Sequence, residues 1–248
     1  MSAPTSLTFN QTVRGITEFI EVAIHGILYV RQIYPAELFI RRKKYETPVF
    51  QSRHPALNTY ISGAVKAVGE ELVLGHVDKV VVVIKNKDEV ALERFIFTIQ
   101  NMIDVEAFNK DTGVEGAMAL SALSQYFRSF LVKLSMMESQ LGELPRDGDN
   151  SFAILLELKD GKAPAAEPAK ETPPPWIPAV TQHTTPGASP DAELHMVRAV
   201  ETGVINLSLA VQESEDKLRL IGEEPFEPPK PVDPGKGKGK GKGKERAE

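Results

Sequence analysis

Cysteine is absent from this chain of 248 residues. Its absence excludes disulfides, thiolate metal sites and a cysteine nucleophile, and nothing favours a secreted scaffold. Long apolar runs are also absent: no stretch approaches the roughly 20 residues that span a bilayer, and the N-terminus has no basic region followed by an apolar one. We therefore expect a protein of the nucleus or cytosol without membrane contact.

The motifs of known catalytic sites are lacking as well. The five histidines lie in no metal-ligand spacing, and His25, on an apolar helical stripe, is expected to be a satisfied core residue. There is no phosphate loop, no dinucleotide fingerprint and no Gly-x-Ser-x-Gly elbow. The sequence therefore predicts a protein that is not an enzyme, with no catalytic residue, no cofactor and no metal.

Charge is unevenly distributed along the chain. The formal net charge is -5, but residues 235–248, a Gly-Lys repeat, carry six positive and two negative charges. Such a repeat cannot bury anything, so we expect residues 223–248 to form a disordered tail. The tail would make at most a weak contact with nucleic acid, or form part of a nuclear import signal; the alternative is a solubilising extension.

Apolar residues recur at helical spacing in three segments, residues 10–33, 54–73 and 114–139. Between the first two, four consecutive cations, Arg41 to Lys44, indicate an exposed, partly extended segment. A strand edge protected by charge is favoured there over a nucleic-acid patch.

Strand patterns follow the second helix. Residues 79–85 and 90–100 are rich in β-branched and aromatic residues and flank a polar turn, which predicts a hairpin. Val80–Ile84 is apolar without alternation and indicates a central strand, whereas Glu93 and Arg94 favour a neighbour with one covered face. A short strand is predicted at 151–159, so the fold class is α+β, with helices packed on a mainly antiparallel sheet.

Residues 160–192 have the composition of a linker, rich in proline and alanine, yet they contain the only tryptophan, Trp176. Two β-compatible segments follow, "ELHMVRAV" and "GVINLSLAVQES", and the second alternates apolar with small or polar residues. The last strands are thus expected to be separated from the body by some thirty linker-like residues.

Several blocks carry a resemblance, in this order: "EFIEVAIHGILYVRQIYPAELFIRRKKYETPV", "HPALNTYI", "DKVVVVI", "ERFIFTI", "FRSFLVKLS" and "PPPWI". Over roughly residues 8–215 the chain resembles the HORMA-domain accessory, non-catalytic subunit of DNA polymerase zeta. The resemblance implies a HORMA domain at 1–222, with a core at about 1–159 and a C-terminal seatbelt at about 160–222 that wraps around an extended partner peptide.

The same resemblance implies the function and partners. The chain is expected to be an adaptor in translesion synthesis that traps a proline-rich segment of the polymerase zeta catalytic subunit and contacts a translesion polymerase scaffold protein. The scaffold contact is in doubt, because the final strand offers Ser208 and Ala210 where relatives present larger side chains. The alternatives are a HORMA regulator of checkpoint or break-repair signalling and, outside the family, a nucleic-acid binder acting through the tail.

The resemblance also assigns residues to two surfaces. Tyr60, Trp176 and, less directly, Tyr34 match aromatic positions that pack on the prolines of the peptide; Tyr60 could instead be core, and Tyr34 a helix-end packing residue. Arg128, Lys133 and Arg41 match basic positions through which relatives form HORMA homodimers or heterodimers, and solvated cations are the alternative. Gln32 stands where relatives can carry a glutamate, which puts an ion pair of that dimer in doubt.

Overall fold

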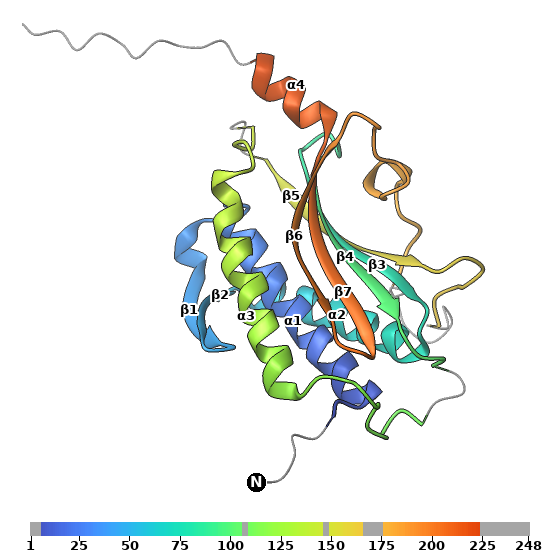
Figure 1. The fold of residues 1–248 in the computed structure, drawn as a ribbon. Coiled ribbons are helices and arrows are strands. Elements are labelled where there is room, and N and C mark those ends of the chain that lie inside the picture. The colour runs from blue at the N-terminus through green and yellow to red at the C-terminus, as the bar shows by residue number, and fades with distance from the viewer. Residues whose placement is uncertain (1–5, 106–108, 146–148, 166–175, 224–248) are drawn as a thin grey trace, which may run out of the picture.

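Three helices lie against one face of a five-stranded antiparallel sheet, and a separate β-hairpin lies on the far side of the helices (Figure 1). The computed structural model describes residues 6–105, 109–145, 149–165 and 176–223. Its elements are α1 (Phe9–Val30), β1 (Phe39–Lys44), β2 (Thr47–Ser52), α2 (Pro55–Leu74), β3 (Val77–Lys85), β4 (Ala91–Asn101), α3 (Leu120–Met136), β5 (Ser151–Leu158), β6 (Glu193–Glu201), β7 (Ile205–Glu213) and α4 (Glu215–Glu223), with 3-10 turns at Ala36–Leu38, Met137–Ser139 and Thr181–His183.

The central helix α1 begins with a capping box, in which the side chain of Thr8 accepts from the N–H of Gln11 and the side chain of Gln11 accepts from the N–H of Thr8. Its buried face centres on Phe19, whose ring stacks on Phe127 of α3 at 4.5 Å and meets Phe97 of β4 edge-on at 6.2 Å. Each such fully buried aromatic contributes about 1.5–3 kcal/mol by leaving water. The core therefore joins α1, α3 and the sheet.

The three predicted helices are confirmed, with corrected ends. Helix α1 ends at Val30 rather than at residue 33, because the next residues turn and Gln32 takes a φ of 51°. Helix α3 begins at Leu120 rather than at residue 114. The preceding residues form a turn at 115–116 between two isolated bridges, in which Gly113 and Ala119 pair with Thr8 and Ser6.

The strand order of the sheet is β5-β3-β4-β7-β6, and all neighbours are antiparallel. The predicted hairpin is β3–β4, and β3 is central as expected, since it pairs with β4 and β5. The expectation of one covered face for β4 is wrong: residues 91–97, which alternate between the two faces, are all buried, and Glu93 and Arg94 are 0% and 3% exposed. Both charges are buried because each has partners, described below.

The last two strands belong to the main sheet. Strand β7 pairs with β4 along nine residues, from Glu213 opposite Glu93 to Ile205 opposite Asn101, and β6 lies outside it as an edge strand. Helix α4, which the sequence analysis did not predict, follows β7 directly and lies at the top of Figure 1. The disordered tail expected from residue 223 falls almost entirely outside the described residues.

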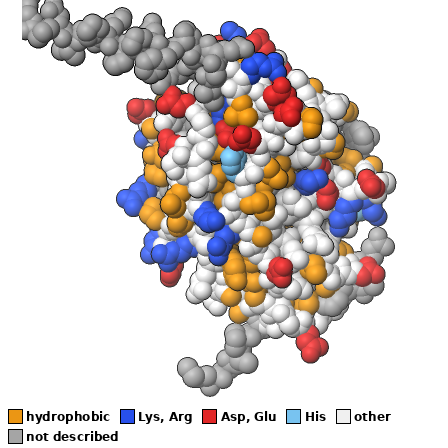
Figure 2. All heavy atoms as spheres, turned by 45° about the horizontal axis from the view of Figure 1, so that its top comes forward, with side chains coloured by type: hydrophobic (Ala, Val, Ile, Leu, Met, Phe, Trp, Pro, Cys, Tyr) orange, Lys and Arg blue, Asp and Glu red, His pale blue; other side chains and the backbone are white. Residues whose placement is uncertain are grey.

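The cationic segment at Arg41 to Lys44 forms one strand of the β1–β2 hairpin, so the expectation of an exposed, extended segment is confirmed. Its turn is tight, and Tyr45 and Glu46 both adopt positive φ. Figure 2 shows the molecule with the top of Figure 1 turned forward, where hydrophobic side chains occupy the middle and Lys and Arg side chains lie mainly toward the margins. Among the described residues, no helix is long and apolar enough to cross a membrane.

Candidate functional site

After β5 the chain passes around the edge of the sheet, from the face covered by helices to the opposite face. We call residues 159–165 and 176–192, the described part of this stretch, the belt segment. On the helix side, the backbone N–H of Ala165 donates to Glu71 of α2 at 2.5 Å, and Trp176 packs against the core cluster formed by the helices. The belt segment is therefore tied to the helix layer before it crosses β5.

On the opposite face, the side chains of Arg94 and Glu157 and the backbone carbonyl of Glu89 hold the belt segment. Arg94 of β4 donates to the backbone carbonyls of Gln182 and His183, and Glu157 of β5 accepts from the N–H of Thr185 at 2.6 Å and from its hydroxyl at 2.5 Å. The carbonyl of Glu89 lies 2.6 Å from Nε2 of His183. We call these contacts the outer anchor. Burial lowers the pKa of Arg94, and the carboxylates of Glu157 and Asp216 oppose this.

A groove of about 790 Å³ lies between β5 and the belt segment. It is bounded on the sheet side by Ala153–Leu156 of β5 and on the other side by Trp176–Val180. Strand β5 is an edge of the sheet and pairs only with β3 among the described strands. The groove thus combines an open strand edge with apolar walls, which is the arrangement that accepts an additional strand.

Tyr60 and Trp176, two of the three predicted aromatic residues, line this groove together. Tyr60 is 49% exposed, so its alternative interpretation as plain core is wrong. Trp176 is half-buried. The roles of both residues in binding stay predictions.

Tyr34 lies outside the groove. It borders a neighbouring hollow of about 720 Å³ between α1, β2 and α3. Its ring and that of Tyr60 both meet Phe152 of β5 edge-on, with centroids 6.3 and 5.7 Å away. Burial raises the pKa of Tyr34, and the nearby Tyr60 adds to this. The sequence analysis missed Phe152 as the residue that links the two tyrosines, although its place in a predicted strand could have pointed to it.

The three predicted dimer residues are exposed cations. Arg128 on α3 borders a groove of about 750 Å³ with Lys43 and Lys44 of the β1–β2 hairpin, and its guanidinium lies 3.9 Å from the carboxylate of Glu46. Lys133 is exposed further along α3, and Arg41 is exposed on β1. The same helix exposes apolar side chains, Tyr126, Val132 and Met136. Such a mixed surface is compatible with association, and the assignment stays a prediction.

A buried cluster of four charges joins α4 to the core, and the sequence analysis did not predict it. Glu93 accepts from Arg31 at 2.9 and 2.6 Å and from Lys217 of α4 at 2.6 Å. Lys217 also pairs with Glu213, and both cations donate to the carbonyl of Gly142, at 2.8 and 3.0 Å. All four side chains are at most 4% exposed. We call this set the charge cluster.

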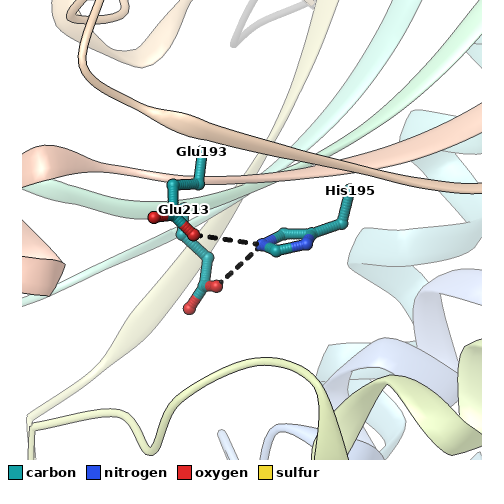
Figure 3. Close-up of side chains that lie close together, drawn as sticks. All are labelled: Glu193, His195 and Glu213. Atoms are coloured by element: carbon teal, nitrogen blue, oxygen red, sulfur yellow. Dashed lines mark hydrogen bonds and ion pairs between the residues drawn. The ribbon is translucent and has the colours of Figure 1, made fainter.

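One further group of side chains has the composition of a metal site. Glu193, His195 and Glu213 bring one potential ligand atom each to within 4.8 Å of one another, on strands β6 and β7 (Figure 3). Nε2 of His195 lies 3.0 Å from the carboxylate of Glu213 and 3.9 Å from that of Glu193. The sequence analysis overlooked this group because its three members are spread over 21 residues and lack a recognisable spacing.

Comparison with known proteins assigns the family. The HORMA domain matches residues 13–204, most of the chain. The chain belongs to the HORMA domain family. The predicted fold class is thereby confirmed, and the segment that we call the belt segment corresponds in place to the start of the predicted seatbelt.

Two curated relatives are similar to this HORMA protein. The mitotic spindle assembly checkpoint protein MAD2B of Danio rerio is 33% identical over 213 residues, which cover 85% of this chain and 95% of the relative. The DNA polymerase zeta processivity subunit of Schizosaccharomyces pombe is 34% identical over 145 residues, 58% of this chain and 67% of the relative. The predicted resemblance to a HORMA accessory subunit of polymerase zeta is confirmed by these names.

Among solved structures, C. elegans HTP-1 bound to a HIM-3 closure motif has the same fold. The TM-score is 0.63 at 14% identity, and the match covers 85% of this chain and 92% of that chain.

Proposed function

We propose that this HORMA protein is a non-catalytic adaptor that holds an extended, proline-rich segment of a partner against strand β5, under the belt segment. The observation that carries the proposal is the groove itself. An edge strand faces a space lined by Tyr60 and Trp176, and the chain crosses over that space with anchors on both faces of the sheet.

The dimensions suit a short peptide. Strand β5 has eight residues, which at about 3.3 Å per residue offer an edge of about 26 Å. Each main-chain hydrogen bond to this edge contributes about 0.5–1.5 kcal/mol, and side-chain pockets add specificity. Prolines are tolerated in an added edge strand where the N–H would point away from the sheet. Proline rings also stack on flat aromatic faces at little cost in entropy.

The belt segment explains how a short peptide is held for long times. A peptide beneath it leaves only when an anchor opens, so affinity is expected mainly as a slow dissociation rate. The outer anchor is polar rather than apolar, although Arg94 and His183 are only 3% and 5% exposed and the Glu157 side chain 13%.

The partner is proposed from the relatives. The relative in Schizosaccharomyces pombe is named as a polymerase zeta processivity subunit, so we propose the catalytic subunit of that polymerase as the source of the peptide, in the nucleus during DNA-damage tolerance. The relative in Danio rerio is named as a spindle checkpoint protein, which keeps checkpoint signalling as the second candidate. A scaffold protein of translesion synthesis could use the outermost strand β6, where Leu194 and Met196 are 59% and 61% exposed.

The test is a binding titration with a synthetic proline-rich peptide from the polymerase zeta catalytic subunit. Trp176→Ala and Tyr60→Ala are each expected to weaken binding at least tenfold, because buried aromatic anchors dominate such interfaces. Tyr126→Ala, which removes an exposed aromatic ring from α3, is the matched control and should bind like the wild type. Unchanged affinity of both groove variants would refute the proposal.

A pull-down with the full chain separates the candidates. Recovery of a large B-family polymerase subunit supports the adaptor of polymerase zeta. Recovery of checkpoint or repair effectors without that subunit supports the second candidate.

A further inference from the structure

We infer that Glu193, His195 and Glu213 form a binding site for a divalent transition metal, Zn²⁺ by preference, that ties the outermost strand β6 to β7. The three side chains come from directly paired strands: Glu193 is opposite Glu213, and His195 lies two residues further on β6, on the same face as Glu193. In Figure 3 the imidazole of His195 points toward both carboxylates.

Carboxylates outnumber cations in this part of the sheet. Glu93, Glu213 and Glu193 stand side by side on β4, β7 and β6, so three carboxylates form a row across the sheet. Arg31 and Lys217 compensate two of them in the charge cluster. Like charges directly opposite each other destabilise paired strands. Among the described residues, the third carboxylate, Glu193, has an ion-pair contact only with the imidazole of His195, at 3.9 Å.

The ligand types and distances select the kind of ion. An imidazole nitrogen and two carboxylate oxygens suit Zn²⁺, whose bonds of about 2.0–2.2 Å place tetrahedral ligand atoms about 3.4 Å apart. The measured separations from Nε2 of His195, 3.0 and 3.9 Å, lie on both sides of that value. Ca²⁺ requires six to eight oxygen ligands, which this group does not supply.

The surroundings orient one ligand and leave the site accessible. One oxygen of Glu213 is held by Lys217 and by the backbone N–H of Gly142 at 3.2 Å, so its other oxygen is fixed toward His195. Such outer contacts are what fix metal ligands in known sites. His195 and Glu193 keep 28% and 61% of their side-chain surface exposed, so an ion can enter from solvent and a water can complete the coordination.

The metal site lies at the opposite edge of the sheet from the groove at β5, so the inference is independent of the proposed function. Strand β6 is an edge strand with six of its nine residues exposed, and among the described elements it contacts mainly β7 and helix α3. A metal bridging β6 and β7 would add a link that this exposed strand otherwise lacks.

The experiment is a calorimetric titration of the full chain with ZnCl₂ in the presence of excess Mg²⁺, supported by the visible absorption of Co²⁺, which is intense in tetrahedral sites. We expect one equivalent to bind, and amide hydrogen exchange on β6 to slow with Zn²⁺ present. The chain has no cysteine, so thiolates cannot contribute to the signal.

Variants assign the binding to these residues. Glu193→Gln, at an exposed position, and His195→Gln should each weaken Zn²⁺ binding at least about tenfold. His54→Gln, a histidine outside the group, should bind like the wild type. The inference is overturned if the wild type binds no Zn²⁺, if Mg²⁺ displaces it, or if both variants bind as tightly as the wild type.

Discussion

Replacing Lys217 by Met tests whether the charge cluster holds helix α4 on the core. The ammonium of Lys217 is fully buried and contacts Glu93 and Glu213, while Arg31 is the second cation of the cluster. Without Lys217, two carboxylates share one guanidinium in a site from which water is excluded. Breaking a buried pair by removing one partner costs about 3–5 kcal/mol, because the remaining charge is uncompensated.

The assay is urea denaturation followed by circular dichroism. A loss of about 3–5 kcal/mol is a large part of the 5–15 kcal/mol that typical domains have, so the midpoint should fall clearly. Arg219→Met is the control: it lies on the same helix and pairs with Glu215, but is 55% exposed, so it should cost at most about 1 kcal/mol.

A second variant separates charge from packing. Lys217→Met combined with Glu213→Gln restores a neutral cluster, with Arg31 and Glu93 still paired, and should recover part of the lost stability. The reasoning is refuted if Lys217→Met is no less stable than Arg219→Met, or if the added Glu213→Gln lowers stability further.

Three further predictions concern other parts of the molecule. Burial lowers the pKa of His25 from 6.5 to about 4, so between these pH values the folded protein keeps the imidazole neutral while the unfolded chain binds a proton. The free energy of unfolding should therefore fall by about 3 kcal/mol as the pH drops from 6.5 to 4. Denaturation at several pH values should show that His25→Gln has lost this dependence. Thr185→Val removes one hydrogen bond of the outer anchor, the bond from the Thr185 hydroxyl to Glu157. In biolayer interferometry the dissociation rate of the peptide should rise about fivefold to tenfold, while the association rate stays the same. An unchanged dissociation rate would contradict the role of the anchor. Arg128→Ala should abolish self-association in sedimentation, whereas Lys66→Ala on α2, at 81% exposure, should not; a dimeric Arg128→Ala would exclude this surface.

The regular elements could be predicted from periodicity because their patterns are local. The apolar stripe of α1, the valine run of β3 and the alternation of β7 each lie within one segment. Two aromatic residues of the groove, Tyr60 and Trp176, could be named only through the resemblance, since composition places Trp176 in a linker.

The remaining features arise from contacts between distant segments. Glu93 and Arg94 were expected to favour an uncovered face, but their partners, Lys217 and the carbonyls of the belt segment, lie about ninety or more residues further along the chain. The same holds for Glu193, which meets Glu213 only because the two strands pair. Helix α4 was missed because it is short and polar, and tertiary contacts through Lys217 stabilise it.

The two edges of the five-stranded sheet differ in how they avoid pairing with other molecules. An exposed, flat strand edge invites aggregation, and proteins prevent this with charges or with a covering segment. Strand β6 carries Glu193, Arg198 and Glu201 in exposed positions, whereas β5 is apolar along much of its length and faces the belt segment across the groove. The belt segment therefore has a second role: it restricts access to the aggregation-prone edge of β5 while no partner peptide is bound. Opening of the outer anchor should accordingly make the unliganded protein prone to aggregate.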